Sequence, residues 1–271
     1  MEIISRTIEY KSRKDNFLIY PIGDIHAGSI HCAEQEIQQK VREIKETKNA
    51  YWLGMGDYAD CILKDDKRFD IGGLAPWVKA DNILRCQSDW IKDLFSPIKG
   101  KCLGLITGNH EESIHSKYQE DFTRNLCTDL GVSYGGYACY VLLRFQRTTG
   151  ETKTSQTYKI HAWHGAGAAQ TEGARLMRLM RLVNDFTAHI YLMGHLHAMT
   201  QHTPDRIDCI GERLKSVKLA ATITGSWLRA YTYSKDSVNP SYAEIKGYKP
   251  SRIGCPIIRI HPDHDTFIIE S

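Results

Sequence analysis

Three short apolar segments in the first half of the chain each end in a glycine and a polar residue, and each precedes a helical pattern. The segments are Phe17–Ile22, residues 51–55 and residues 102–107, and they lead into Gly23-Asp24, Gly56-Asp57 and Gly108-Asn109. A repeated order of strand, turn and helix favours a mainly parallel sheet covered by helices. Ligand sites in such folds lie beyond the carboxyl ends of the strands. We therefore expect the three polar residues to share one edge of a sheet.

The helices after these strands are predicted from apolar residues that recur every three or four positions. Residues 33–48 carry such a repeat, with Glu and Lys on the other side, and residues 81–95 carry a similar one. One further helix is predicted from four apolar residues spaced four apart: Tyr118, Phe122, Leu126 and Leu130.

The second half of the chain contains more strand-like segments. Residues 137–146 and 157–163 are expected to be neighbouring strands joined by the polar turn 148–151, and a helix is expected over residues 170–185. The remaining predicted strands are residues 188–193, 217–224, 257–260 and 266–269, with a surface loop over residues 231–251. Because no repeat or linker interrupts the chain, a single domain over residues 1–271 is expected.

Composition excludes several classes of protein. A formal net charge of +3 is too small to indicate a nucleic-acid-binding surface by itself. No apolar run approaches the roughly 20 residues that cross a bilayer, and residues 1–16 lack the apolar core of a signal peptide. The eight cysteines are scattered without a Cys-x-x-Cys pair, which favours reduced thiols. We therefore expect a cytoplasmic protein without a membrane partner.

Residues that can bind metals follow five apolar strands in an ordered series. Divalent metals that polarise phosphate favour oxygen ligands and neutral imidazole, and a paired site needs a carboxylate that can bridge. A single Asp-x-His, or a lone His after a strand, is more often structural, but all five in order are hard to obtain by accident. The five groups are Asp24-Ile25-His26, Gly56-Asp57-Tyr58-Ala59-Asp60, Gly108-Asn109-His110-Glu111, Trp163-His164-Gly165 and Gly194-His195-Leu196-His197.

This series resembles the calcineurin-like metallophosphoesterase superfamily, whose motifs are Asp-x-His, Gly-Asp-x-x-Asp, Gly-Asn-His-Asp/Glu, a lone His and Gly-His-x-His. The resemblance runs from Gly23 to His197, and every ligand position is filled. It implies a four-layer α/β/β/α sandwich, with two mixed sheets flanked by helices. It also implies two divalent metal ions, the first held by Asp24, His26, Asp57 and His197, and the second by Asp57, Asn109, His164 and His195.

The resemblance also implies a mechanism, in which His110 matches the family's catalytic histidine and faces the substrate rather than a metal. Two ions roughly 3.5–4 Å apart can hold a bridging water, lower its pKa and stabilise the charge that develops on phosphorus. A histidine whose pKa lies near neutrality can then protonate the departing oxygen. Ligands of this kind are compatible with manganese, iron, zinc or magnesium, and we predict manganese.

Several residues outside the ligand set have both a functional and a structural interpretation. Asp60 and Glu111 are candidates to orient a metal-bound histidine, or they are solvated loop acids. Arg175 lies in the predicted helix after His164, where an arginine can bind phosphate or simply form part of a solvated face. Aromatic residues of the last third offer base stacking or core packing: Trp227, Tyr231 and Tyr233.

The substrate is the least constrained prediction. The Gly-Asn-His-Glu motif is shared with serine/threonine protein phosphatases of the superfamily, but their second motif continues with Val-Asp-Arg-Gly. This chain has Tyr58-Ala59-Asp60-Cys61 instead and lacks that phosphate-binding Arg. We therefore predict a phosphodiesterase or nuclease acting on a nucleotide or nucleic acid. The alternatives are a phosphomonoesterase or protein phosphatase of the same superfamily and a non-catalytic nucleic-acid-binding protein.

The short chain with its Gly-Ser-Trp segment also resembles phage-encoded members of the superfamily, for which the host cytoplasm would be the location. Nothing in the sequence indicates the oligomeric state.

Overall fold

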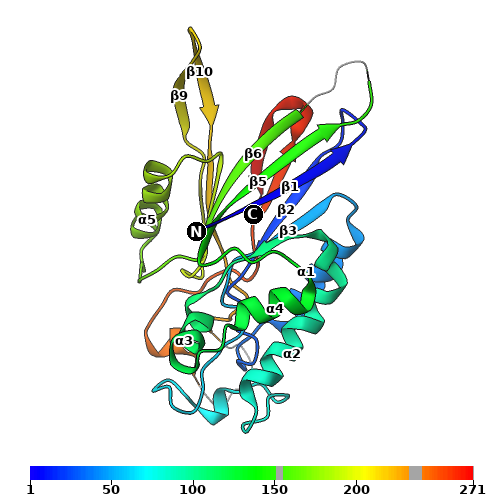
Figure 1. Ribbon diagram of the computed structural model, residues 1–271. Helices are drawn as coiled ribbons and strands as arrows, with labels where there is room; N and C mark the ends of the chain where they lie inside the picture. The colour runs from blue at the N-terminus through cyan, green and yellow to red at the C-terminus, as the bar shows by residue number, and fades with distance from the viewer. Residues whose placement is uncertain (151–154, 232–239, 271) are drawn as a thin grey trace.

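The computed structural model describes residues 1–150, 155–231 and 240–270. Two large β-sheets lie face to face, and helices cover their outer sides (Figure 1). One sheet has five strands in the order β13-β12-β2-β3-β4, and the other has six in the order β1-β5-β6-β7-β11-β8. Both sheets combine parallel and antiparallel pairs, which agrees with the two mixed sheets that the resemblance implies.

The five-stranded sheet contains the three strands that were predicted in the first half of the chain. They are β2 (Phe17–Ile22), β3 (Ala50–Gly54) and β4 (Cys102–Leu105), and they are parallel neighbours as predicted. The edge beside β2 is antiparallel, formed by β12 (Ile257–His261) and β13 (Thr266–Glu270). The prediction of a mainly parallel sheet is therefore correct only for β2, β3 and β4, the strands that precede the candidate site.

The six-stranded sheet consists of β1 (Glu2–Tyr10), β5 (Ala138–Arg147), β6 (Ser155–Trp163), β7 (Ile190–Met193), β11 (Ala220–Thr224) and β8 (Met199–His202). Strands β5 and β6 pair in antiparallel fashion as expected, and residue 151 of their predicted turn lies outside the described residues. Strand β1, which pairs in parallel with β5, was not predicted. Its charged residues face solvent, while Ile4, Ile8 and Tyr10 are buried.

Helices α1 (Glu34–Glu46), α2 (Ile83–Phe95) and α4 (Phe122–Leu130) lie on the five-stranded sheet, and α5 (Glu172–Asp185) lies on the six-stranded sheet. Helix α3 (Asn109–Tyr118) begins directly after β4 at the candidate site. The short elements are η1 (Ile71–Gly73), η2 (Ser96–Lys101), α6 (Tyr242–Ile245) and η3 (Pro262–His264). Helix α6 falls in the predicted surface loop, of which residues 232–239 lie outside the described residues.

The single helix predicted to contain both Tyr118 and Leu130 is wrong, because the chain forms α3 and α4 there instead. Gln119 has a left-handed backbone, with a φ of 57°, which ends α3. The Asp121 carboxylate then accepts a hydrogen bond from the backbone N–H of Arg124 and starts α4. An aspartate in this position is a strong signal for a helix start, and here it outweighs the fourfold spacing of apolar residues.

The single strand predicted over residues 217–224 is also wrong. Strand β10 (Arg213–Lys218) ends within this range, at Lys218, and β11 begins at Ala220 in a different sheet. The backbone N–H of Leu219 donates to the Pro204 carbonyl oxygen, where the chain passes from one sheet to the other. Strands β9 (Asp205–Ile210) and β10 form a hairpin that projects beyond the six-stranded sheet (Figure 1).

Three apolar clusters separate the four layers of the sandwich. The first, which includes Ile37 and Trp52, lies between the helices and the five-stranded sheet. The second lies between the two sheets and includes Leu53 and Val141, and the third joins α5 to the six-stranded sheet. All eight cysteines are free. Within the described part of the chain, no helix has the length and apolar character that a membrane crossing requires.

Candidate metal centre

The carboxyl ends of five strands bring the candidate ligands to one place between the sheets and α3. Loops after β2 and β3 carry the aspartates, the start of α3 carries Asn109, and loops after β6 and β7 carry the remaining histidines. Among the described residues, three groups place potential ligand atoms within 4.8 Å of one another. These groups are Asp24, His26, His197; Asp57, His164, His195; and His26, Asp60, His110. The first two fall within the two ligand sets that the resemblance implies, and the third joins His26 to two residues outside those sets.

The backbone of these loops is in the left-handed region at five of the seven candidate ligands. Their φ angles are 50° at Asp24, 52° at His26, 51° at Asp57, 70° at His195 and 47° at His197. Such conformations cost about 1–3 kcal/mol each for residues with a side chain, and they persist only where the surroundings determine them. They point the ligand side chains of successive loops toward a common centre. Strain of this kind is concentrated at functional sites.

Hydrogen bonds between the loops hold this backbone in place. The Asp24 and Ile25 N–H groups donate to the carbonyl oxygens of Gly56 and Asp57, at 2.9 and 2.8 Å. On its other side, the Asp24 carbonyl oxygen accepts from the Ser226 hydroxyl and the Trp227 N–H, both at 2.9 Å. Trp227 is buried in the core, so packing rather than base stacking is the correct interpretation of this residue.

Glu111 is the main anchor of the loop that carries Asp57. Its carboxylate is 1% exposed and accepts backbone hydrogen bonds from four residues: Asp57 (2.9 Å), Tyr58 (2.6 Å), Ala59 (3.2 Å) and Gly108 (3.0 Å). Glu111 is therefore not a solvated loop acid, and its partners are backbone N–H groups rather than the histidine that was expected. Burial, together with the neighbouring Asp57 carboxylate, raises the pKa of Glu111 to about 7.

In the first ligand group, one nitrogen from each of two imidazole rings lies close to the other. The Nε2 atoms of His26 and His197 are 3.1 Å apart, and His197 Nε2 is 3.3 Å from Asp24 Oδ1. The other ring nitrogen of His26, Nδ1, lies 3.4 Å from Asp60 Oδ1. Burial lowers the pKa of His26, which favours its neutral form. If Nδ1 carries the proton toward Asp60, the lone pair of Nε2 points at His197, as a metal ligand requires.

The second group places three acceptor atoms together. His164 Nδ1 donates to the Met55 carbonyl oxygen at 2.7 Å, so in the neutral ring Nε2 carries a lone pair. That nitrogen is 3.0 Å from Asn109 Oδ1 and 3.3 Å from Asp57 Oδ2. A proton on Nε2 links these atoms in the metal-free protein, and a cation can take its place when the ring is neutral. Although burial lowers the pKa of His164, the Asp57 carboxylate outweighs this and raises it to about 10, which shows the pull of the site on positive charge.

His195 is oriented for the same group by contacts at both ends of the residue. Its backbone N–H donates to the Asp24 carboxylate, at 3.1 and 3.0 Å to the two oxygens. Its ring Nε2 is 3.0 Å from the Gly167 carbonyl oxygen, which leaves Nδ1 as the acceptor. Oxygen and imidazole donors without thiolates suit manganese, iron, zinc or magnesium. The donor chemistry and the converging lone pairs therefore fit a pair of divalent ions.

His110 lies beside both groups but is held by neighbours that leave one ring nitrogen free. Its backbone N–H donates to Asp57 Oδ1 at 2.9 Å, and its Nδ1 donates to the Asp60 carbonyl oxygen. The ring packs edge-to-face on His26, with centroids 4.6 Å apart. Burial lowers the pKa of His110, but Asp57 and Asp60 outweigh it and raise the pKa above its usual value. This side chain can therefore hold a proton at Nε2.

Arginines around the site have partners that the sequence did not predict. Arg175 Nε donates to the Ala169 carbonyl oxygen at 3.1 Å, and Arg178 donates to Ala166 and Ala168 in the same loop. They thereby anchor the loop that follows His164. Arg68 pairs with Asp66 through two hydrogen bonds, and the pKa of Arg68 is raised by Asp66 first and then by Asp60 and Asp57. A run of charged residues surrounds Arg68 in the sequence and hides this proximity to the centre.

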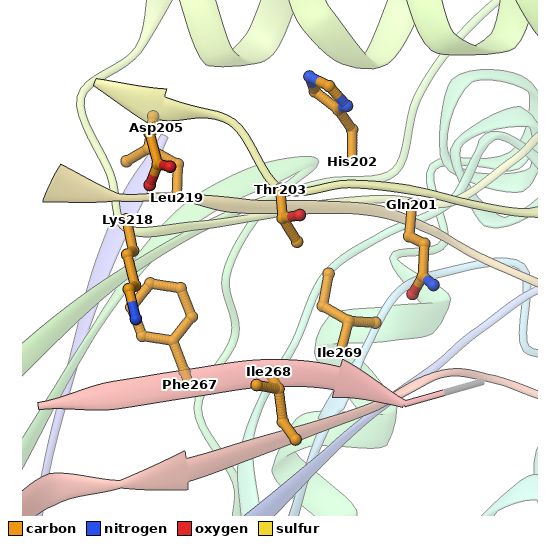
Figure 2. Close-up of a pocket in the computed structure, with 9 residues that line it drawn as sticks. All are labelled: Gln201, His202, Thr203, Asp205, Lys218, Leu219, Phe267, Ile268 and Ile269. Carbon is orange, nitrogen blue, oxygen red and sulfur yellow. The ribbon is translucent and has the colours of Figure 1, made fainter. Parts of the chain in front are cut away.

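A cavity of about 600 Å³ lies away from this centre, between β13 and the root of the projecting hairpin. Gln201 and Thr203 point from one side of it toward Ile269 on the other, while His202 points away from β13 (Figure 2). None of the candidate ligands lines this cavity. It is therefore separate from the candidate metal centre.

Comparisons with known proteins give one family match over more than half of the chain. A family model described as calcineurin-like phosphoesterase matches residues 17–199, which include all the candidate ligands. A solved structure of a conserved uncharacterized protein from Streptococcus pneumoniae TIGR4, described as a predicted phosphoesterase, is 13% identical. It covers 91% of this chain and 84% of its own, and its TM-score of 0.34 is too low to support any argument. The search of curated proteins gives no match. Because the family model spans more than half of the chain, this protein belongs to the calcineurin-like phosphoesterase family.

Proposed function

We propose that this protein is a metal-dependent phosphodiesterase that acts on a nucleotide or nucleic acid. The observation that carries the proposal is the convergence of His164 Nε2, Asn109 Oδ1 and Asp57 Oδ2, three atoms that can all bind one cation once His164 has lost its proton. The family supplies the coarser statement, that of a phosphoric ester hydrolase. The phosphodiester and its nucleotide character are the finer steps that we propose.

The proposed metal sites divide the ligands into two sets that share Asp57. Asp24, His26, Asp57 and His197 would hold one ion, and Asp57, Asn109, His164 and His195 the other. Manganese is our choice of metal, since the ligands are carboxylate, amide and imidazole. Two such ions would supply Lewis acidity toward the phosphoryl oxygens and a water of lowered pKa.

The chain's own residues would supply the proton and determine the side from which substrate reaches the site. His110 holds its proton at Nε2 because Nδ1 is bound to the Asp60 carbonyl oxygen, and it would pass that proton to the departing oxygen. His197 keeps a side chain that is 31% exposed, whereas those of His164 and Asp57 are almost fully buried. Substrate would therefore approach from the side of His197.

The preference for a diester rests on charge. A phosphodiester carries one negative charge near neutral pH, whereas a phosphomonoester carries up to two. In this chain the buried, uncharged Cys61 follows Asp60, at the position where related protein phosphatases have Arg. Loss of that cation weakens the attraction for a dianion more than the attraction for a monoanion. Arg68 is the nearby cation that we propose to contact the remaining phosphoryl oxygen.

The test compares bis-(p-nitrophenyl) phosphate with p-nitrophenyl phosphate, using purified protein with manganese. We expect faster cleavage of the diester and loss of activity in the Asp57→Asn variant. Cleavage of the monoester alone would refute the proposal in favour of a phosphatase, and salt-dependent DNA binding without hydrolysis would favour the non-catalytic alternative. A panel of cyclic nucleotides, dinucleotides, single-stranded DNA and phosphopeptides then separates nuclease from nucleotide phosphodiesterase.

We also propose a cytoplasmic location, which eight free thiols favour.

A further inference from the structure

The hairpin of β9 and β10 forms a two-stranded sheet of its own and projects away from the body of the molecule (Figure 1). Its two-residue turn, Gly211-Glu212, begins with a glycine whose φ is +64°. The described side chains on both strands are exposed except that of Val217, which is partly buried. Among them, Ile207 is 67% exposed and Leu214 is 76% exposed. Arms of this kind present free strand edges to other molecules.

The outer edge of β9 is available for backbone pairing. In a hairpin with a two-residue turn, the residues that flank the turn exchange hydrogen bonds, and the pattern alternates from there. Ile210 and Arg213 flank the turn here, so residues 210, 208 and 206 bond to β10. The N–H and C=O groups of residues 205, 207 and 209 therefore point away from β10. Within the described part of the chain, β9 has β10 as its one sheet neighbour.

The two outer edges of the hairpin differ in charge. Strand β10 carries Arg213, Lys215 and Lys218 and no acidic residue. Two copies of this strand would bring cations together, and lysines on an edge are a known protection against pairing. Strand β9 carries Asp205, Arg206 and Asp208, and one N–H of the Arg206 guanidinium donates to the Val183 carbonyl oxygen of α5 at 2.8 Å, which leaves its other N–H groups for an acid. Both signs are thus present on β9, so this edge can complement itself.

Symmetry then selects one register. A two-fold axis perpendicular to the sheet keeps side chains on their own face, so an antiparallel pair of β9 strands must be centred on a residue. A centre at Asp205, Arg206 or Asp208 would put like charges opposite each other, and a centre at Cys209 would pair Ile207 with the turn. A centre at Ile207 puts Ile207 on Ile207 and each Arg206 opposite Asp208 of the other copy. It also uses the outward N–H and C=O groups of Ile207 for mutual hydrogen bonds.

We propose that two copies of this chain associate through antiparallel pairing of their β9 strands, centred on Ile207. The two hairpins then form a four-stranded sheet in the order β10-β9-β9-β10, with the cationic strands outermost. The exposed Ile207 side chains cover each other across the axis. The arm lies outside the metal centre, so this association does not depend on the proposed catalytic function.

Sedimentation velocity of the full chain tests the association. We expect a dimer for the natural sequence and a monomer for Ile207→Pro, which removes the outward N–H at the centre of the pair. The matched control is Ser216→Pro, because Ser216 lies opposite Ile207 in the hairpin and its N–H faces the other outer edge. It should remain dimeric. Thermal unfolding of both variants checks that the body stays folded. A monomeric natural protein, or a dimer unaffected by Ile207→Pro, overturns the proposal.

Charge reversal tests the register. Asp208→Arg places two arginines opposite each other at both ends of the pair, which should weaken the dimer about ten-fold or more. Adding Arg206→Asp to that variant restores opposite charges and should recover most of the affinity. If the single and double variants dimerise equally, the Ile207-centred register is wrong.

Cross-linking gives an independent measure of the same register. An Ile207→Cys, Cys209→Ser double variant should form a covalent dimer under mild oxidation. The natural Cys209 should not, because pairing at Ile207 separates the two Cys209 residues by about 13 Å along the strands. Efficient cross-linking through Cys209 instead would place the centre elsewhere and overturn the assignment.

Discussion

Removal of the Glu111 carboxylate should destabilise the protein more than loss of an ordinary buried side chain. Glu111 accepts hydrogen bonds from the N–H groups of Asp57, Tyr58, Ala59 and Gly108 in a position that is 1% exposed. In Glu111→Ala all four donors lose their partner. A buried donor left unsatisfied costs about 1–3 kcal/mol, so the four together cost about 4 kcal/mol or more. That is a large share of the 5–15 kcal/mol by which a typical domain is stable.

Urea denaturation of the metal-free protein measures this loss directly. Glu111→Gln should fall between the natural protein and Glu111→Ala, because its amide keeps one acceptor oxygen but turns an NH₂ group toward N–H donors. The matched control is Glu112→Ala, an exposed acid in the same helical turn, which should change the free energy of unfolding by no more than about 0.5 kcal/mol. A loss below about 1 kcal/mol in Glu111→Ala, the value of one net hydrogen bond, would refute the reasoning.

Three further predictions concern the metal centre. His110→Ala should lower kcat by about 10²–10⁴-fold with metal content unchanged, measured by steady-state kinetics and metal analysis, and an undiminished rate would exclude His110 as the proton donor. His164, with its pKa raised to about 10 in the metal-free protein, must lose a proton to bind metal, so metal affinity should rise with pH across the range from about 6.5 to 10. Calorimetry in buffers of different ionisation enthalpy should show the released proton, and an affinity independent of pH would contradict this assignment. Gly108→Ala places a Cβ 2.1 Å from Asp57 Oδ1 and should abolish metal binding, whereas Gly100→Ala, with nothing within 4 Å, should leave it intact.

The strands that precede the candidate ligands, and the positions of those residues, could be predicted from sequence because both depend on local patterns. An apolar run followed by Gly and then Asp or Asn predicts a buried strand and the turn at its end. In a parallel sheet these ends lie along the same edge. Strand β1 could not be predicted, because its charged residues alternate with too few apolar ones. Its partner strand β5 is also far from it in the sequence. The break between α3 and α4 was missed because fourfold spacing continues across it, although Asp121 was a readable signal.

The roles of the supporting residues depend on contacts between distant segments, which no local pattern records. Glu111 lies next to the catalytic motif, yet its partners are the N–H groups of another loop more than 50 residues away. Similarly, the Ser226 hydroxyl donates to the Asp24 carbonyl oxygen, although the two residues are 202 positions apart in the sequence. Arg68 lies near the candidate metal centre in a loop that contains many charged residues, so nothing in the sequence distinguishes it from the others. Prediction from sequence therefore named candidate ligands that the fold brings together, but not the residues that hold their loops in place.

The left-handed backbone at the ligands explains why so much of the supporting structure is polar and buried. Five ligand residues in this conformation cost the chain about 1–3 kcal/mol each, and packing of apolar side chains cannot fix a turn of the backbone so closely. Hydrogen bonds to N–H and C=O groups can, and the loops around Asp24 and Asp57 are held in this way by Gly56, Glu111 and Ser226. The geometry of the candidate ligands is thus set by the protein itself. Replacing these partners should therefore weaken metal binding even though none of them touches a metal.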